Sequence, residues 1–248
     1  MRFTRAPEVA AGRRRAGVSG LVTGDAYVAA LSADASDRST RTAFVHLALA
    51  LTRPRARIFD FGCGPGQDAR FYADCDREVY AHDVDPDMCA SFRRHCASGL
   101  ALGSIRLVEH GSAVPPIDLV TANFAPLNLV PDLAPLFGKF AAMLSHDGQL
   151  LLSVLNPLHA GDLRYAWWWK GLLPLWLDGC YRVSGSQAPI TRWRPSRLAR
   201  QAELHFSLDH VYVPLALRAQ RLRSPRHWPA AWSARFLFLH MSKLPAPP

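Results

Sequence analysis

Cysteine is scarce in this sequence of 248 residues, and its five cysteines contain no C-x-x-C pair. They are Cys63, Cys75, Cys89, Cys96 and Cys180. An odd, scattered set argues against a disulfide scaffold or a zinc cluster, so we expect no metal site and a reducing compartment. Gly20, Gly24 and Asp25 interrupt the apolar residues near the start of the sequence. We therefore expect no signal peptide and predict a cytoplasmic location.

A long apolar run is also missing. The most apolar stretch, Ala166 to Leu177, covers only a dozen residues and contains Lys170 and Pro174. A membrane-spanning helix needs about 20 apolar residues, so no transmembrane span is expected. The chain is nevertheless 49% hydrophobic, which is too much for a disordered protein. Its length and composition predict one globular domain with a buried core.

Acidic residues are outnumbered, with 20 Asp and Glu against 29 Lys and Arg and a formal net charge of +9. The excess lies in residues 1–20, with five Arg and one Glu, and in residues 190–227, with eight Arg, one Glu and one Asp. Such segments suit nucleic acid, an anionic membrane surface or an acidic substrate, and a solvated surface is the alternative. We interpret residues 1–20 as a flexible basic arm and residues 21–248 as a single domain.

Apolar strands alternate with helical stretches along most of the chain. The expected strands are Arg57–Phe61, Glu78–His82, Ile105–Val108, Ile117–Thr121, Gln149–Leu155, Phe206–Val213 and Ala234–Met241. The expected helices are Asp25–Leu31, Arg41–Leu51, Gln67–Ala73, Pro86–Cys96, Pro131–Leu144 and Pro195–Leu204. Several strands are apolar on both faces, which predicts an α/β fold with a seven-stranded, mostly parallel sheet and helices on both faces. The link between Val108 and Ile117 is too short for a full crossover helix.

Residues 157–188 interrupt this alternation with a tryptophan-rich insert. Its segments 165–170 and 172–177 together hold four tryptophans and a run of leucines. Such an insert can form a lid over an apolar acceptor, lie in a membrane interface, or pack against the sheet edge or a second copy of the chain. We expect it to determine specificity, with Trp168 in the substrate pocket.

The most informative stretch is the turn after the strand Arg57–Phe61. Residues 60–66 read D-F-G-C-G-P-G and lead into a helix whose free N–H groups can face a ligand. Asp83 ends the next strand, where an acid can accept both hydroxyls of a ribose. Gln67 stands where the nicotinamide fingerprint has its third glycine, and the sequence has no Gly-Lys-Ser/Thr phosphate loop. These features predict a nucleoside-bearing ligand without a pyrophosphate.

The glycine turn resembles the first motif of the class I S-adenosylmethionine-dependent methyltransferases, which have a Rossmann-like fold. Residues 81–88 resemble their second motif, 117–124 their fourth-strand motif and 146–151 the turn before their fifth strand. The resemblance covers about residues 55–155 and implies S-adenosylmethionine as the cofactor. The implied cofactor-binding residues are Asp60, Gly62, Cys63, Gly64, Gly66, Asp83, Val84 and Asn123. Many relatives carry an Asp near the end of strand three, where this sequence has Gly111 and Ser112.

Methyl transfer from a sulfonium depends on positioning and on exclusion of water, so no dedicated catalytic motif is required. We leave the catalytic residue unknown and name His159 as the candidate base for a hydroxyl acceptor. Residues 123–126, N-F-A-P, depart from the N-P-P-Y motif of adenine-N6 methyltransferases, which disfavours that class. Tyr27 and Arg41 precede the first strand, where relatives often wrap over the cofactor. The expected substrate-pocket residues are Tyr27, Arg41, His159 and Trp168.

These features favour methylation of a small apolar or aromatic metabolite, with oxygen as the preferred acceptor atom. An RNA or protein methyltransferase that uses the Arg-rich segments is the alternative, although no RNA-binding module is recognised. A non-catalytic scaffold with the same fold is a third interpretation, and the intact Gly62, Gly64 and Asp83 argue against it. We expect a small-molecule partner and no nucleic acid. Peripheral membrane contact and homodimerisation stay open.

Overall fold

The computed structural model describes residues 33–109, 111–184, 189–215, 217–222 and 228–245. The strands of its main sheet are β1 (Arg57–Phe61), β2 (Glu78–His82), β3 (Ile105–Leu107), β4 (Ile117–Ala122), β5 (Leu144–Leu155), β8 (Phe206–Leu215), β9 (Arg218–Arg221) and β10 (Phe236–Lys243). Their order in space is β3-β2-β1-β4-β5-β10-β8-β9. Strands β1 to β5 pair in parallel, whereas β10 runs antiparallel to both β5 and β8. The expected α/β class is confirmed.

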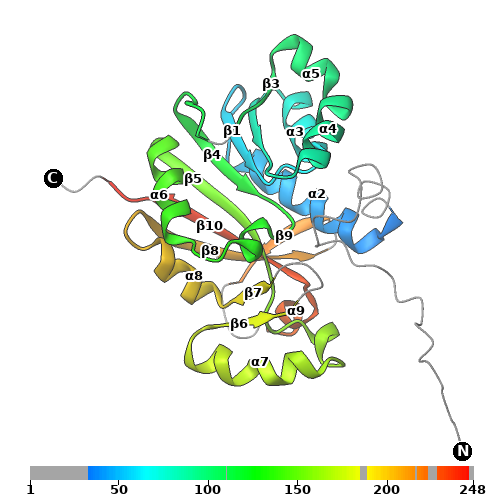
Figure 1. Ribbon diagram of the computed structural model, residues 1–248, viewed down its shortest axis with the longest axis vertical. Helices are drawn as coiled ribbons and strands as arrows, with labels where there is room; N and C mark the ends of the chain where they lie inside the picture. Colours follow the sequence, from blue (N-terminus) through cyan, green and yellow to red (C-terminus); the bar gives the residue numbers. More distant parts are fainter. Residues whose placement is uncertain (1–32, 110, 185–188, 216, 223–227, 246–248) are drawn as a thin grey trace, which may run out of the picture.

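Helices cover both faces of this sheet, as Figure 1 shows. They are α2 (Ala35–Ala50), α3 (Gln67–Asp74), α4 (Pro86–His95), α5 (Ala97–Leu102), α6 (Ala134–Met143), α7 (Ala166–Leu177), α8 (Pro195–Ala202) and α9 (Trp228–Ser233), with short 3-10 turns η1 (Pro126–Leu129) and η2 (Ala160–Asp162). Neighbouring strand residues face opposite sides, so Ile58 packs with the side chains of α2, α3 and α4 while Phe59 packs with those of α6 and α8. The domain therefore has two apolar cores, one on each face of the sheet.

The expected number of seven strands is wrong, because the sheet has eight. The extra strand is β9, which pairs antiparallel with β8 at the edge of the sheet. Its sequence R-A-Q-R has no apolar alternation, and all four of its residues are at least partly exposed. Short polar edge strands carry no periodic signal, and charge on such strands discourages pairing with other chains.

Three expected boundaries differ from the structure by three residues or more. The helix expected at Arg41–Leu51 begins earlier, at Ala35, because the Asp34 carboxylate caps it by accepting from the Ser36 N–H at 2.8 Å. The helix expected to begin at Pro131 begins at Ala134. Strand β5 begins at Leu144 and includes the turn expected at residues 146–148, which the structure accommodates as a shift in register against β4.

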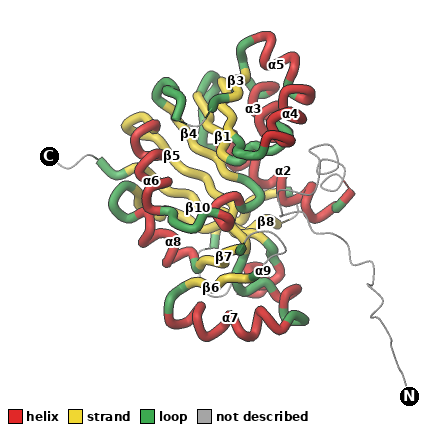
Figure 2. Tube along the Cα trace, viewed as in Figure 1, coloured by secondary structure: helices red, strands yellow, loops and turns green. Residues whose placement is uncertain are grey.

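The link between β3 and β4 contains no helix in its described residues, so the crossover helix is lost and both strands are where the pattern predicts them. The helix expected at Asp25–Leu31 and the basic arm lie outside the described residues. Figure 2 shows the loops and turns between the helices and strands of the described residues in green.

The tryptophan-rich insert folds as helix α7 followed by a hairpin of β6 (Cys180–Val183) and β7 (Ile190–Trp193). Asn128 in η1 joins this hairpin to the main sheet, since its Nδ2 donates to the Thr191 carbonyl and its Oδ1 accepts from the Leu155 N–H at 3.1 Å. The Tyr181 hydroxyl donates to the carbonyl of Pro157 at 3.0 Å. The insert is therefore attached at the carboxyl ends of β4 and β5.

Replacement of Asn128 by Ala should destabilise the domain by about 1–3 kcal/mol, because it leaves a buried N–H and a buried carbonyl without partners. Urea unfolding of the Asn128→Ala protein measures this loss. The control is Ser196→Ala, which removes an exposed hydroxyl from α8 and should leave the unfolding midpoint in place. Equal midpoints for Asn128→Ala and wild type would contradict the role given to Asn128.

Candidate active site

The glycine turn between β1 and α3 has a backbone that other residues rarely adopt. Its three glycines have φ angles of 70° at Gly62, 53° at Gly64 and 88° at Gly66. At Gly66 a Cβ atom would also lie 2.7 Å from the Phe92 ring. The His82 carbonyl accepts from the Gly62 N–H at 2.8 Å and from the next amide at 3.1 Å. Contacts with β2 and α4 thus fix the shape of the turn.

Asp83 joins this turn to the end of β2. Its Oδ2 accepts from the Gly64 N–H at 2.8 Å, and its Oδ1 accepts from the Asp85 N–H at 2.9 Å. A carboxylate offers about four acceptor positions, so two remain for a ligand. The neighbouring Val84 is 83% exposed. The structure therefore brings the expected ribose acid into direct contact with the glycine turn.

A small pocket, partly open to solvent, lies over the turn. The described residues that line it are Arg41, Asp60, Gly62, Cys63, Gly64, Pro65, Gln67, Asp68, Asn123 and Phe124. Five of the expected cofactor residues are among them, together with Arg41, which was expected to contact substrate. Gly66 within the turn, and Asp83 and Val84 after β2, are not among the residues that line the pocket. Their assignment as cofactor-binding residues stays a prediction, as does that of the lining residues.

Asp60 is the most unusual group in the pocket, because its carboxyl is only 2% exposed. The Thr121 hydroxyl donates to its Oδ1 at 3.1 Å, whereas its Oδ2 has no hydrogen-bond partner among the described residues. Burial, and next the nearby Asp68 carboxylate, raise the pKa of Asp60 to about 8. The unpaired oxygen at the pocket would be stabilised by a positively charged ligand group.

Asp68, in the first turn of α3, is a pocket residue that the sequence reasoning missed. Its Oδ2 accepts from the Asn123 side-chain amide at 2.8 Å, and its Oδ1 lies 3.3 Å from Nε of Arg41. The Arg41 guanidinium also lies 5.0 Å from the centre of the Phe124 ring. An acid in a first helical turn is ordinarily explained by the helix dipole, so the sequence carried no signal for this ion pair.

The other expected substrate residues lie apart from this pocket or outside the described residues. His159 precedes η2, and burial lowers the pKa of its half-buried imidazole against the opposing effect of Asp162. Trp168 is 6% exposed on the inner face of α7. Tyr27 lies outside the described residues. The substrate-pocket roles of these three residues stay predictions.

The chain matches a family model described as a methyltransferase domain over residues 58–148, the segment that holds the glycine turn, most of β1, β2 to β4 and the start of β5. Residues 58–148 thus have the sequence pattern of a methyltransferase domain. The expected resemblance to the class I methyltransferases is confirmed.

Two curated relatives match about half of the chain each. A malonyl-[acyl-carrier protein] O-methyltransferase from Enterobacter lignolyticus is 32% identical over 128 residues, which are 51% of this chain and 50% of the relative. A protein of the same name from Salmonella typhimurium is 29% identical over 122 residues, 49% of this chain and 47% of the relative. The chain thus spans about half the length of the curated relatives it matches.

Solved structures share the fold over a larger part of the chain. A TehB-like SAM-dependent methyltransferase from Corynebacterium glutamicum has a TM-score of 0.59 at 15% identity and covers 89% of this chain and 98% of its own. A Burkholderia thailandensis 1,6-didemethyltoxoflavin-N1-methyltransferase, solved with S-adenosylhomocysteine and its substrate, has a TM-score of 0.54 at 18% identity and covers 82% of this chain and 76% of its own. At these identities the likeness shows the fold of the methyltransferase domain alone.

Replacement of Asp60 by Asn should stabilise the ligand-free protein, and the gain should grow as the pH rises. The Asp60 pKa is about 8 in the folded chain against a usual 3.8, so its favourable contribution to stability is complete below pH 4 and is lost as the pH rises through 8. The wild type should therefore lose up to about 1.4 kcal/mol per pH unit relative to Asp60→Asn within that window.

Urea unfolding of both proteins at pH 5, 6.5 and 8 measures this difference. Asp74→Asn removes an exposed carboxylate from α3 and serves as the control. We expect the difference in unfolding free energy between Asp60→Asn and wild type to change with pH. A constant difference across the three pH values would contradict the buried, unpaired state of Asp60.

Proposed function

We propose that the chain is an S-adenosylmethionine-dependent methyltransferase that acts on a small apolar or aromatic acceptor, with oxygen as the acceptor atom. One observation carries this proposal. The Asp83 carboxylate at the end of β2 accepts a hydrogen bond from the Gly64 N–H, which joins the expected ribose acid to the glycine turn. The methyltransferase domain at residues 58–148 supports the activity. The two relatives named as O-methyltransferases support oxygen as the acceptor atom.

The residues present fit S-adenosylmethionine, which carries a ribose, an ammonium group and a sulfonium. The two free acceptor positions of Asp83 suit the ribose hydroxyls. The unpaired Oδ2 of Asp60 suits a cationic group of the ligand, since a positive charge beside it favours the ionised carboxylate. Gly62 and Gly64 line the pocket, so the ligand would lie against their backbone.

The bound cofactor would supply an already activated methyl group, so the residues of the chain have to orient the acceptor and exclude water. Orientation alone can contribute roughly 7–11 kcal/mol in well-aligned reactions. Phe124 and Arg41 both line the pocket, with the Arg41 guanidinium carbon 5.0 Å from the centre of the Phe124 ring. A carboxylate acceptor needs no base, whereas a hydroxyl acceptor would use one. Burial lowers the pKa of His159, which favours the neutral imidazole that a base requires.

The alternative of an RNA or protein methyltransferase depends on exposed arginines, and the structure removes one of them from that role. Arg192 is 9% exposed, with its guanidinium 3.1 Å from the Asp162 carboxylate and 2.8 Å from the Asn156 carbonyl. This arginine attaches the insert to the sheet instead of displaying charge. The non-catalytic scaffold is disfavoured because the pocket keeps an unpaired carboxyl that the fold alone does not use.

The proposed function is tested by calorimetric titration of the full chain with S-adenosylmethionine and S-adenosylhomocysteine, followed by transfer of a labelled methyl group to a panel of acceptors. The panel contains hydroxylated aromatics, apolar carboxylic acids and matched amines. Saturable binding together with transfer to an oxygen is the expected result. Absence of binding would overturn the enzyme assignment, and transfer restricted to the amines would overturn the choice of oxygen.

Replacement of Asp83 by Ala should weaken S-adenosylmethionine binding by about 1–3 kcal/mol, because the charged hydrogen bonds to the ribose are lost. Asp83→Asn keeps a side-chain acceptor for the Gly64 N–H and separates the loss of charge from damage to the turn. The control is Asp87→Ala, which removes an exposed carboxylate in the first turn of α4. Calorimetry on the three proteins measures the change, and unaltered affinity in both Asp83 variants would refute the ribose assignment.

A further inference from the structure

Helix α7 presents an apolar face to solvent on the side opposite to the one that packs against the protein. Its buried residues are Trp168, Gly171 and Leu175. At Gly171 a Cβ would lie 2.6 Å from the Tyr181 ring, so the contact of α7 with the hairpin is close-packed. The orientation of the helix is therefore fixed by its inner face, and its outer residues cannot turn inward.

The outer face holds two tryptophans and two leucines at helical spacing. Their exposed fractions are 59% for Trp169, 64% for Leu173, 70% for Trp176 and 62% for Leu177. Residues 169, 173, 176 and 177 lie within one stripe of an α-helix. Isolated exposed apolar residues need no explanation, whereas a contiguous patch of this kind marks an interaction surface. We call these four residues the outer stripe of α7.

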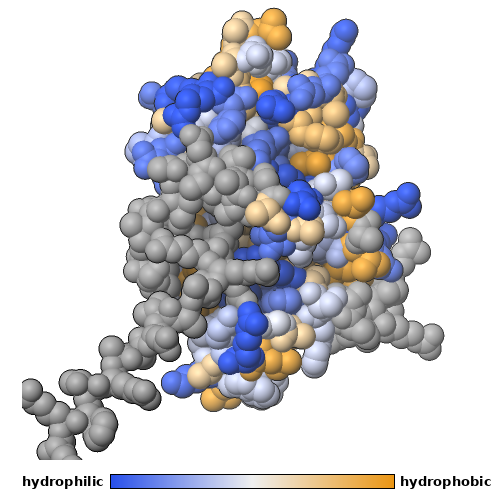
Figure 3. All heavy atoms as spheres, turned by 90° about the vertical axis from the view of Figure 1, so that its right-hand side faces the viewer, coloured by the Kyte–Doolittle hydropathy of each residue, from blue (hydrophilic) through white to orange (hydrophobic). Residues whose placement is uncertain are grey.

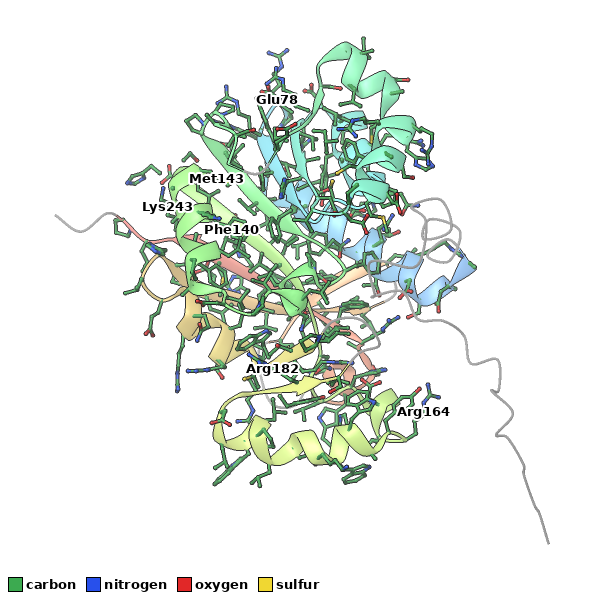
Figure 4. All side chains as sticks on the ribbon, in the orientation of Figure 1. Glu78, Phe140, Met143, Arg164, Arg182 and Lys243 are labelled. Carbon is green, nitrogen blue, oxygen red and sulfur yellow. The ribbon has the colours of Figure 1, made fainter. Side chains whose placement is uncertain are left out.

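The charged residues around the outer stripe are mainly basic. Residues 163–184 contain Arg164, Lys170 and Arg182 against the single acid Asp178, and all four are exposed. Figure 4 shows Arg164 at the start of α7 and Arg182 on the hairpin above it. Arg197 of α8 lies beside the end of α7, since it packs against Gly179. A Cβ atom added to Gly179 would lie only 2.7 Å from the Cβ of Arg197. The surroundings of the stripe therefore complement a negatively charged surface.

We propose that the outer stripe of α7 docks on the surface of an anionic lipid bilayer. Tryptophan and leucine on one face of a helix with flanking basic residues are the composition of helices that lie in a membrane interface. Figure 3 shows hydrophobic and hydrophilic residues side by side at the lower end of the molecule, the height at which Figure 1 shows α7. None of the helices in the described part of the chain has the length and apolar character to cross a bilayer.

The polar atom of one stripe residue is already satisfied within the protein. The Trp169 Nε1–H donates to the Leu163 carbonyl at 2.8 Å. Its ring can therefore enter an apolar layer without leaving a donor unpaired, which would otherwise oppose insertion. The helix follows the carboxyl end of β5, so a docked α7 would place the edge of the sheet that carries the glycine turn on the membrane side of the molecule.

A second copy of the chain fits the stripe less well than a bilayer does. At the exposures given above, the four side chains offer roughly 500 Å² of apolar surface. A stable protein interface takes about 800 Å² from each partner.

The docking is tested by flotation of the full chain with vesicles of phosphatidylcholine, alone or in an equal mixture with phosphatidylglycerol. Binding to the mixed vesicles, much reduced on phosphatidylcholine alone and weakened by added salt, is the expected result. Trp169→Ser/Trp176→Ser should bind at least about tenfold more weakly, because two buried apolar side chains are lost. Arg164→Glu/Lys170→Glu should lose binding to the mixed vesicles in particular.

The matched control is Leu102→Ser/Leu204→Ser, which removes two side chains that are each 83% exposed on other parts of the domain. This variant should bind vesicles as the wild type does. Equal binding by the control and the tryptophan variant would overturn the proposal, as would absence of vesicle binding by the wild type.

Light scattering tests whether a second copy of the chain covers the outer stripe. A wild-type dimer that Trp169→Ser/Trp176→Ser turns into monomers would overturn docking on lipid. Cofactor affinity, measured separately, is expected to be the same in all variants.

Discussion

The amide hydrogens of the glycine turn need acceptors, and the end of β2 supplies them. The His82 carbonyl accepts from the Gly62 and Cys63 N–H groups, and the Asp83 carboxylate accepts from Gly64. The parallel register that pairs Phe61 with His82 places these acceptors beside the turn. Because the same bonds shape the turn and orient the acid, the two motifs cannot move independently. A ligand that contacts both meets a preformed site.

The two buried carboxyl groups at the pocket above the turn, Asp60 and Asp68, have unequal partners. Asp68 has a cationic partner in Arg41, whereas Asp60 has only the Thr121 hydroxyl. An ionised Asp60 would be close to a second carboxylate, so burial and repulsion both favour its protonated form. A cation bound in the pocket reverses that preference. A positively charged ligand group would therefore interact more favourably with Asp60 than a neutral one of the same shape.

Strands that are buried on both faces were the most predictable elements. Strands β1 and β2 have the bounds expected from the sequence, because short apolar runs end at a glycine turn and at an acid. Strand β9 and the hairpin of β6 and β7 were not predicted, since each of these strands has only four residues and carries too little periodic signal. Element type followed from the local apolar pattern where that pattern was long enough to read.

The site shows the same division. Its glycines and Asp83 were predictable because the chemistry of a nucleoside ligand demands those residue types at that spacing. Asp68 was not, because its importance arises from Arg41 on α2, which reaches it only after α2 packs across the sheet. The spacing of the glycines and Asp83 along the chain predicts the class of ligand. The packing of α2 decides which charged side chains, such as Arg41, surround that site.

Two features of the structure are unfavourable in the isolated chain and become favourable with a partner. Inside, the Asp60 carboxyl is desolvated without a full set of hydrogen bonds. Outside, Trp169 and Trp176 remain in water although the inner face of α7 is fully packed. Neither feature improves folding, and core residues nearby show that this sequence readily buries apolar groups. Residues that oppose stability at two separate places are best explained by what binds there, a cation in the pocket and an apolar surface at α7.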